Sequence, residues 1–277
     1  MSRRSAADAG TALPIAVDDV AVRFGSPGSG VTALERCTLE VPAGSFTVII
    51  GPNGCGKSTL LRLMAGLLPP SGGTVRVGGA RPRAGDGRLG IAFQQPRLVP
   101  WRSTLDNVAL PLELAGADAP VRRRAAVQAL ERVGLAHAAG LRPRELSGGM
   151  AQRAALARAL ITDPPVLLLD EPFSALDALT RETFDAELQR LWVERRCTVV
   201  LVTHSVPEAI HLADRVIVMT PRPGRVARIV GVDLPRPRPT ELGGDPRVAT
   251  LAAEVRGALA EAHAVELRPW AEQDGAA

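Results

Sequence analysis

The sequence of 277 residues contains no tyrosine and a single lysine, and aromatic residues make up only 3% of it. Its three cysteines, Cys37, Cys55 and Cys197, stand far apart and include no Cys-x-x-Cys pair. An odd number of cysteines excludes a disulfide framework, and their spacing excludes the usual zinc sites. The cysteine pattern therefore favours a protein of a reducing compartment.

Long hydrophobic runs are also absent. The longest, such as residues 166–169 and 199–202, are far shorter than the roughly 20 residues that span a membrane. The first ten residues hold two arginines with no apolar stretch behind them, so we do not expect them to act as a secretory signal. Hydrophobic residues still make up 46% of the chain, which is enough for a substantial core in one large domain, with or without a small appendage.

The excess of basic residues is small. The chain has 33 Lys plus Arg against 29 Asp plus Glu, a net charge of +4. Its one run of three arginines, residues 122–124, lies in the stretch 120–133, which is patterned like a solvent-exposed helix. Such dispersed charge favours an arginine-covered surface over a nucleic-acid-binding patch, and no nucleic-acid partner is expected.

Short β-rich runs alternate with helical stretches, which predicts an α/β fold with a largely parallel sheet. We expect a disordered lead-in over residues 1–12, a main domain over 13–240 with a helical subdomain over about 96–161, and a C-terminal helical extension over 241–277. Strands are predicted over 15–24, 37–41, 46–50, 74–77, 90–93, 166–169, 198–202 and 215–219, with a small strand pair in 221–239. Helices are predicted over 58–67, 107–114, 120–133 and 245–263.

Residues 51–58 read Gly-Pro-Asn-Gly-Cys-Gly-Lys-Ser and match the phosphate-loop motif G-x-x-x-x-G-K-[ST] without a mismatch. An expected strand precedes the motif and an expected helix follows it. Glycines let several backbone N–H groups converge on one anion, and the helix start adds its positive dipole end. Lys57 would reach the β- and γ-phosphates of a nucleotide, and Ser58 would offer its hydroxyl to Mg²⁺. The predicted nucleotide-binding residues of this loop are Gly51, Pro52, Asn53, Gly54, Cys55, Gly56, Lys57, Ser58 and Thr59.

The only lysine of the chain is Lys57. A lysine placed at random among the 33 basic positions would fall in this motif about once in 33 trials. Its retention indicates a chemical requirement for a compact ammonium group, which the planar fork of arginine does not meet. Cys55, in the same loop, is either a small tolerated residue or a redox switch.

Two further motifs follow downstream. Residues 166–169 form an apolar run that ends in Asp170 and Glu171. Asp170 would hold Mg²⁺ through water, and Glu171 would orient or deprotonate an attacking water, although two acids can also simply cap a strand. Ser147, Gly148 and Gly149 precede a helical run and offer a second anion site, although such a turn alone is often only a helix cap.

These motifs, in this order, resemble an ATP-binding-cassette (ABC) ATPase: a phosphate loop, Leu-Ser-Gly-Gly at 146–149, and a strand that ends in Asp-Glu-Pro at 170–172. The resemblance covers about residues 15–239. It implies a P-loop NTPase core with a mostly parallel sheet, an antiparallel β subdomain and a helical insertion. It also implies ATP hydrolysis with Mg²⁺ as cofactor.

The resemblance extends to four further positions. Phe24 matches the aromatic residue that stacks on adenine, and residues 174–177 match the D-loop. Gln94 matches the Q-loop glutamine, which serves catalysis and the metal. His204 matches the switch histidine that contacts the γ-phosphate, although a histidine here can also cap a helix. The sequence departs from the family at Met150 and Ala151, where glutamine and a polar residue are common, and this affects expectations about the dimer seam.

The family resemblance also implies partners. Each ATP would be clamped between Lys57 of one copy and Ser147 and Gly149 of a second copy in a head-to-tail dimer. Separate transmembrane permease subunits, served by a solute-binding protein, would hold the dimer at the cytoplasmic face of the cell membrane as a peripheral subunit.

Finer matches at 96–101, 106–108, 223–225 and 234–238 resemble the nitrate/sulfonate/taurine importer branch. The alternative is a soluble ABC ATPase acting on nucleic acid or ribosomes, but such proteins usually carry two cassettes, coiled-coil insertions or zinc cysteines. A P-loop nucleotide kinase would lack the Leu-Ser-Gly-Gly motif. The transported solute is not encoded in this chain.

Overall fold

The computed structural model describes residues 12–26, 30–85, 87–173, 178–238 and 245–264. Its larger sheet has six strands in the order β5-β6-β7-β3-β8-β9. The first five strands run parallel, and β9 is antiparallel to β8. These strands are β3 (Phe46–Ile50), β5 (Leu89–Ala92), β6 (Val166–Asp170), β7 (Thr198–Thr203), β8 (Arg215–Met219) and β9 (Val226–Gly231).

Strands β3, β6 and β7 are buried along their whole length. A parallel strand covered on both faces has no solvent side, so its sequence is a continuous apolar run rather than an alternating one. This explains the apolar runs at 166–169 and 198–202, and it confirms the predicted α/β class with a largely parallel sheet.

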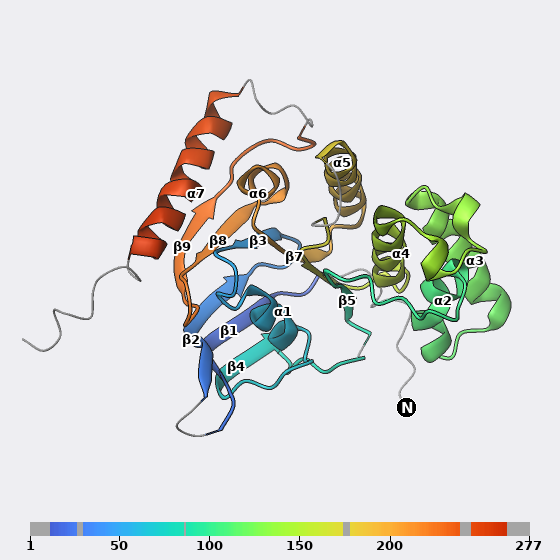
Figure 1. Cartoon of the computed structure of the whole chain (residues 1–277), viewed down its shortest axis with the longest axis horizontal. Helices are drawn as coiled ribbons and strands as arrows, with labels where there is room; N and C mark the ends of the chain where they lie inside the picture. The colour runs from blue at the N-terminus through green and yellow to red at the C-terminus, as the bar shows by residue number, and fades with distance from the viewer. Residues whose placement is uncertain (1–11, 27–29, 86, 174–177, 239–244, 265–277) are drawn as a thin grey trace, which may run out of the picture.

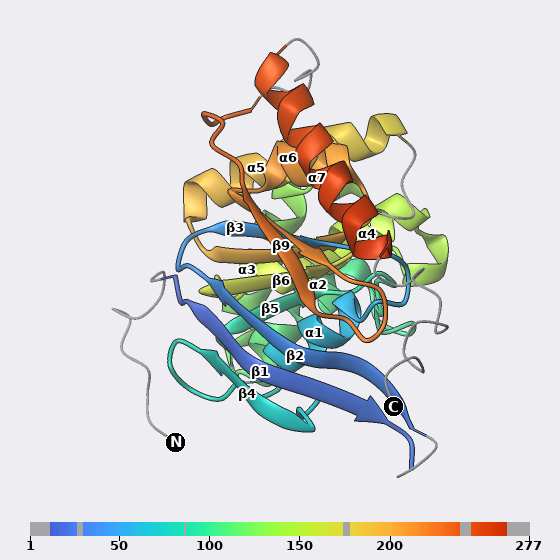
Figure 2. The ribbon, with the colours of Figure 1, turned by 90° about the vertical axis from the view of Figure 1, so that its left-hand side faces the viewer.

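A second sheet of three antiparallel strands has the order β2-β1-β4, formed by β1 (Ile15–Phe24), β2 (Val31–Val41) and β4 (Gly72–Val77). Helix α1 (Lys57–Met64) packs its leucines between this sheet and the larger one. Helices α5 (Ala178–Arg195), α6 (Val206–Leu212) and α7 (Pro246–Ala264) cover the other face of the larger sheet. Figure 2 shows these layers one above another, with the small sheet at the bottom and α5–α7 at the top.

Three helices form a lobe beside the larger sheet, at the right of Figure 1. They are α2 (Thr104–Leu114), α3 (Ala119–Arg132) and α4 (Gly148–Leu160), and they enclose a small core of their own around Val108 and Leu130. The α4 helix ties the lobe to the sheet, because Gln152 donates to the carbonyl of Phe93 across 3.0 Å. Among the described residues, no helix has the length and apolar character to cross a membrane.

Several elements differ in extent from the sequence-based expectation. Strand β2 begins at Val31 instead of residue 37, and α1 ends at Met64 instead of residue 67. Helix α2 begins at Thr104 because the Ser103 hydroxyl accepts a hydrogen bond from the backbone of Asp106 and caps it. The strand pair predicted within 221–239 is wrong for the described residues 221–238, which contribute one strand, β9, and its partner is β8.

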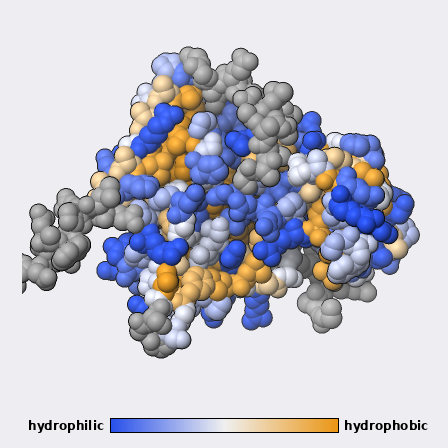
Figure 3. Space-filling model, in the orientation of Figure 1, coloured by the Kyte–Doolittle hydropathy of each residue, from blue (hydrophilic) through white to orange (hydrophobic). Residues whose placement is uncertain are grey.

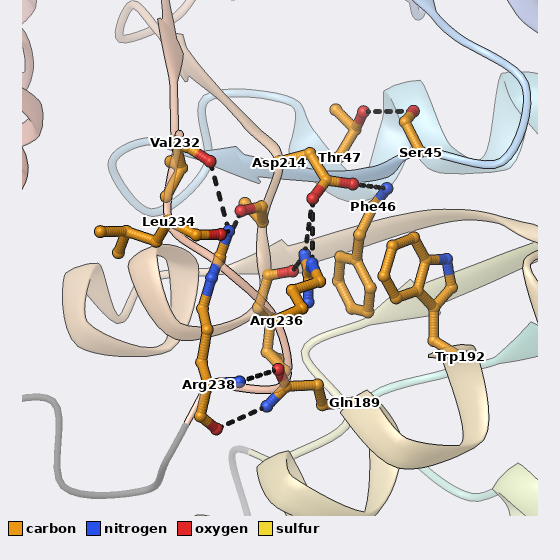
Figure 4. Close-up of polar contacts among 12 residues, drawn as sticks. Ser45, Phe46, Thr47, Gln189, Trp192, Asp214, Val232, Leu234, Arg236 and Arg238 are labelled. Atoms are coloured by element: carbon orange, nitrogen blue, oxygen red, sulfur yellow. Dashed lines mark hydrogen bonds and ion pairs between the residues drawn. The ribbon is translucent and has the colours of Figure 1, made fainter. Parts of the chain in front are cut away.

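The segment after β9, residues 232–238, which we call the C-terminal strap, is held by two arginines (Figure 4). Arg238 is only 3% exposed, and its guanidinium donates to backbone carbonyls at the end of α6 and in the strap. Arg236 donates to Asp214 and lies over the ring of Trp192 at 4.3 Å. Arginine was expected to cover the surface, and these two residues instead fill the unsatisfied carbonyl end of a buried helix.

Candidate functional site

The carboxyl ends of the parallel strands meet at one edge of the larger sheet, which is where ligands bind in open α/β folds. The register is nearly level there: Ile50 of β3 pairs with Thr203 of β7, and Val202 of β7 pairs with Asp170 of β6. The segments that follow these strands therefore lie side by side. They carry the phosphate loop after β3, Gln94 after β5, Glu171 after β6 and His204 after β7.

A cavity of about 770 Å³ opens at this edge. Among its lining residues are Lys57, Gln94, Glu171 and His204, together with Phe24 from the small sheet. The cavity is about the size of a cofactor-binding site. The structure thus brings residues from five separate segments of the sequence, spread over 180 positions, to one site.

The phosphate loop has the backbone that its motif predicts. Gly54 and Gly56 adopt positive φ values of 77° and 103°. A Cβ atom on Gly56 would also lie 2.7 Å from the Leu34 side chain, so the position needs glycine for both reasons. Helix α1 begins directly afterwards, and its free N–H groups and positive dipole end make this turn an anion site.

Lys57 is buried at 5% exposure. Its Nζ donates to the carbonyls of Gly51 at 2.9 Å and Pro52 at 3.0 Å, so the ammonium closes the loop onto itself. An ammonium has three N–H donors. Two of them hold the loop, and the third has no protein partner among the described residues, which leaves it for an anion in the cavity.

Ser58 and Asp170 join the phosphate loop to the end of β6. The Ser58 hydroxyl donates to Asp170 Oδ1 at 2.7 Å. A hydroxyl and a carboxylate side by side supply the hard oxygen ligands that Mg²⁺ prefers, next to the place where a phosphate would lie. This donor set fits magnesium.

The carboxylate of Glu171, which follows β6, lies close to side chains that follow the two neighbouring strands, β5 and β7. Its Oε2 accepts from Gln94 Nε2 at 3.3 Å and lies 3.7 Å from His204 Nδ1. Glu171 adopts a φ of +43°, a left-handed conformation that a residue with a side chain rarely takes, and its N–H donates to Val202. Strain of this kind, about 1 kcal/mol, recurs at active sites, where the surroundings hold it in place.

Phe24 lies at the end of β1 with 46% of its surface exposed, on the rim of the cavity. A flat, accessible ring beside an anion site suits stacking against a base. Asn53 and Thr59 also line the cavity, whereas Cys55 is buried at 1% exposure beneath the loop. Burial raises the pKa of the Cys55 thiol, which disfavours the reactive thiolate and supports the simpler interpretation of a small tolerated residue.

The predicted second anion site lies elsewhere. Ser147 caps α4, with its hydroxyl accepting from the N–H of Met150 at 3.2 Å, and Gly148 and Gly149 form the first turn of the helix. Among the described residues, none of these three is part of the cavity lining. The residues predicted for the D-loop, 174–177, lie outside the described part of the chain.

Sequence reasoning missed Arg222, which lines the cavity and donates to the Gly54 carbonyl from Nε at 3.2 Å and Nη2 at 3.1 Å. It stands in the turn between β8 and β9. Gly224 of the same turn approaches the loop so closely that a Cβ on it would lie 2.0 Å from the Cys55 carbonyl oxygen. Its position in the sequence could have indicated this role, because Arg222 follows a predicted strand, as Glu171 and His204 do.

Comparison with known proteins gives a consistent result. Residues 34–174 match the family described as ABC transporter. The chain is 43% identical to the taurine import ATP-binding protein TauB of Rhizobium johnstonii over 250 residues, which cover 88% of this chain and 95% of the relative. It is 47% identical to the aliphatic sulfonates import ATP-binding protein SsuB 2 of Pseudomonas fluorescens, over 88% of this chain and 85% of the relative.

Among solved structures, a similar chain is the dimeric ATP-binding cassette MJ0796 in a post-hydrolysis state bound to ADP and Pi. The TM-score is 0.73 at 32% identity, over 79% of this chain and 99% of that chain.

Proposed function

The chain belongs to the ABC transporter family of ATPases, and on that premise we propose that it drives solute import by hydrolysing ATP at the site described above. The observation that carries the assignment of the site is the arrangement around one cavity of an anion-binding loop with its lysine and a carboxylate held by Gln94 and His204. An anion site that binds the phosphates and a carboxylate beside it that can orient water suit the transfer of the γ-phosphoryl group to water.

In this proposal ATP binds with its base against Phe24 and its phosphates in the loop 51–59. Lys57 and the N–H groups at the start of α1 bind the β- and γ-phosphates. Ser58, Asp170 and Gln94 would hold Mg²⁺. When bound, the ion neutralises charge that develops on the phosphate oxygens.

Glu171 would orient a water molecule toward the γ-phosphate and accept its proton. Gln94 holds the carboxylate from one side, and His204 stands on the other side, where it would contact the γ-phosphate. Because these three groups come from three strand ends of one sheet, their spacing is fixed by the sheet and not by a loop alone.

A second copy of the chain would complete the site. Ser147, Gly148 and Gly149 form an anion site at a helix start but do not line the cavity of their own chain. Two such chains arranged head to tail would place the α4 start of one against the nucleotide of the other, giving two equal sites. The similar cassette MJ0796 is dimeric in a state bound to ADP and Pi, which supports the pairing of two copies.

The import role rests on the names of the relatives, one a taurine import ATP-binding protein and the other an aliphatic sulfonates import ATP-binding protein. We infer a small sulfonate, taurine, nitrate or related solute, carried by separate permease subunits that a solute-binding protein supplies, with this chain on their cytoplasmic side. The helical lobe offers a docking surface, since Trp101 and Leu114 are 76% and 80% exposed. Figure 3 shows apolar residues among hydrophilic ones on this lobe.

Purification from native membranes tests the proposal. The tagged full chain is expected to bring down an integral membrane protein, and the complex in proteoliposomes is expected to take up taurine or an alkanesulfonate only when ATP is supplied on the side of this chain. The matched control is the same complex with Glu171→Gln. Recovery of ribosomes or nucleic acid without a membrane protein would instead support the soluble alternative.

A further inference from the structure

The turn that carries His204 connects β7 to α6 and is held by a buried acid four residues further on. Glu208 lies in the first turn of α6 and is 5% exposed. The His204 side chain itself is 58% exposed, so packing of the imidazole does little to fix it. The position of this histidine therefore depends on the backbone of its turn.

Hydrogen bonds among Thr203, Ser205 and Glu208, which we call the relay, hold the backbone on both sides of His204. The N–H of Ser205 donates to Thr203 Oγ1 at 3.0 Å, and the Thr203 hydroxyl donates to Glu208 Oε2. The Ser205 hydroxyl accepts from the N–H of Glu208 at 3.3 Å. In an ordinary capping box the acid would bind the N-cap N–H directly. Here the Thr203 hydroxyl lies between the Ser205 N–H and the Glu208 carboxylate. The cap therefore also includes the last residue of β7.

Glu208 also lies next to the candidate active site. A second, narrow cavity behind that site is lined by Glu208 and Thr203 and shares Glu171 and His204 with the nucleotide cavity. Glu208 Oε1 is buried and has no hydrogen-bond partner among the described residues. A buried oxygen without a hydrogen-bond partner is costly and calls for an explanation, and this one lies beside residues of the candidate active site.

The charges around Glu208 come from three elements: Glu171 after β6, Arg181 on α5 and His204 after β7. Burial raises the pKa of Glu208 to about 7; its bond from Thr203 and the charge of Arg181 lower the pKa, and Glu171 raises it further. The carboxyl therefore changes its charge near neutral pH. An ionised carboxylate is the stronger acceptor for the Thr203 hydroxyl, so ionisation tightens the relay.

We propose that Glu208 is a positioning residue for ATP hydrolysis, which acts through Thr203 and Ser205 to hold His204 where it faces Glu171 and the terminal phosphate. This inference rests on the proposed function of the site. It adds a residue that does not line the nucleotide cavity and whose effect falls on turnover, not on binding.

A double-mutant cycle in the full-length protein tests the relay. Thr203→Val removes the hydroxyl and keeps the shape, and Glu208→Ala removes the carboxylate. Each is expected to lower kcat about tenfold or more, because a displacement of about 1 Å at a catalytic group has effects of that order. KM and the Kd for ATP are expected to stay within about twofold, since neither residue binds the nucleotide. The double variant is expected to be no slower than the slower single variant.

Three further variants serve as controls. Thr203→Ser keeps the hydroxyl and is expected to keep most of the activity. Glu208→Gln mimics the neutral acid, so its kcat should match that of the wild type below about pH 6 and fall behind as the pH rises through about 7. Ser103→Ala removes a helix cap of the same kind from α2, in the helical lobe, and should leave kcat unchanged. If Glu208→Ala does not fold, Thr203→Val and Glu208→Gln test the relay alone.

The outcomes separate the two proposals. A wild-type protein that does not turn over ATP would overturn the proposed function. Normal turnover in the wild type together with wild-type kcat in Thr203→Val, or with losses that multiply in the double variant, would overturn the relay while leaving the proposed function standing.

Discussion

The Ser58 hydroxyl donates to Asp170 Oδ1 at 2.7 Å, although the two residues are 112 positions apart in the sequence. This contact joins the first turn of α1 to the end of β6. It places two oxygen ligands for a cation against the loop that would bind the phosphates, and Asp170 is only 4% exposed. Magnesium, phosphate and the Glu171 carboxylate would therefore be held at the ends of β3 and β6, which flank β7 in the same sheet.

Replacing Asp170 with asparagine tests this pairing. Asp170→Asn keeps the shape and the contact with Ser58 but removes the negative charge that a cation needs. We expect the affinity for ATP in magnesium to fall to the level measured with EDTA, and binding without magnesium to stay unchanged. Titration of a fluorescent ATP analogue with and without magnesium measures this difference. A variant whose affinity still rises with magnesium would argue against Asp170 as a ligand.

The requirement for lysine at position 57 can be tested with the residue that the chain uses at every other basic position. Lys57→Arg keeps the charge, but the guanidinium is larger than the ammonium that sits between the Gly51 and Pro52 carbonyls. We expect Lys57→Arg and Lys57→Ala to lose ATP affinity by about a hundredfold, the effect of losing charge-assisted hydrogen bonds. Equilibrium binding measures it. Near-normal binding by Lys57→Arg would mean that charge alone suffices.

Arg222 and Arg225 form a matched pair in one turn. Arg222 holds the Gly54 carbonyl of the phosphate loop, whereas Arg225 pairs with Glu35 at 2.5 Å, where its side chain is 54% exposed. We expect Arg222→Ala to weaken ATP binding about three- to tenfold, with little change in kcat, because it removes two hydrogen bonds that shape the loop. Arg225→Ala should be close to neutral, since exposed ion pairs contribute little. Equal effects of the two variants would assign the result to the turn and not to Arg222.

The stability of the protein should depend on pH through His211. Burial, with Arg238 and Arg236 adding to it, lowers the pKa of His211 to about 4. An unfolded histidine has a pKa of about 6.5, so between these values the unfolded state binds the extra proton. The contribution of His211 is complete above about pH 6.5 and is lost as the pH falls toward 4.

His211→Gln removes this titration and can still hydrogen-bond to Gln189, which lies 3.3 Å from His211 Nε2. Between about pH 6.5 and 4.5 the free energy of unfolding should fall by up to roughly 2 kcal/mol more in the wild type than in His211→Gln. Urea unfolding at several pH values measures it, with the exposed His137→Gln as control. Parallel pH curves for wild type and His211→Gln would contradict this account.

The sequence predicted those residues of the site that a short, contiguous motif identifies. Lys57 and Ser58 lie in a contiguous motif, and Asp170 and Glu171 follow an apolar run, so their neighbours along the chain identify them. The sheet class followed from the same apolar runs, because a strand buried on both faces has no polar positions.

Long-range contacts could not be predicted in this way. Arg238 is an arginine between prolines, and nothing nearby in the sequence shows that it would bind the carbonyls of a buried helix end. The relay from Ser205 to Glu208 was missed for a different reason. The spacing Ser-x-x-Glu is visible, but the insertion of the Thr203 hydroxyl into the cap depends on where β7 ends.

A single-turnover experiment with Glu171→Gln separates the binding of ATP from the activation of water that we assign to Glu171. The amide keeps an oxygen acceptor for Gln94 but cannot take a proton from water. We expect the variant to bind Mg-ATP at wild-type affinity, to lose hydrolysis by at least about a hundredfold, and to run as a dimer with ATP and as a monomer with ADP. Hydrolysis of the bound ATP at the wild-type rate, by a protein that stays monomeric, would contradict the account.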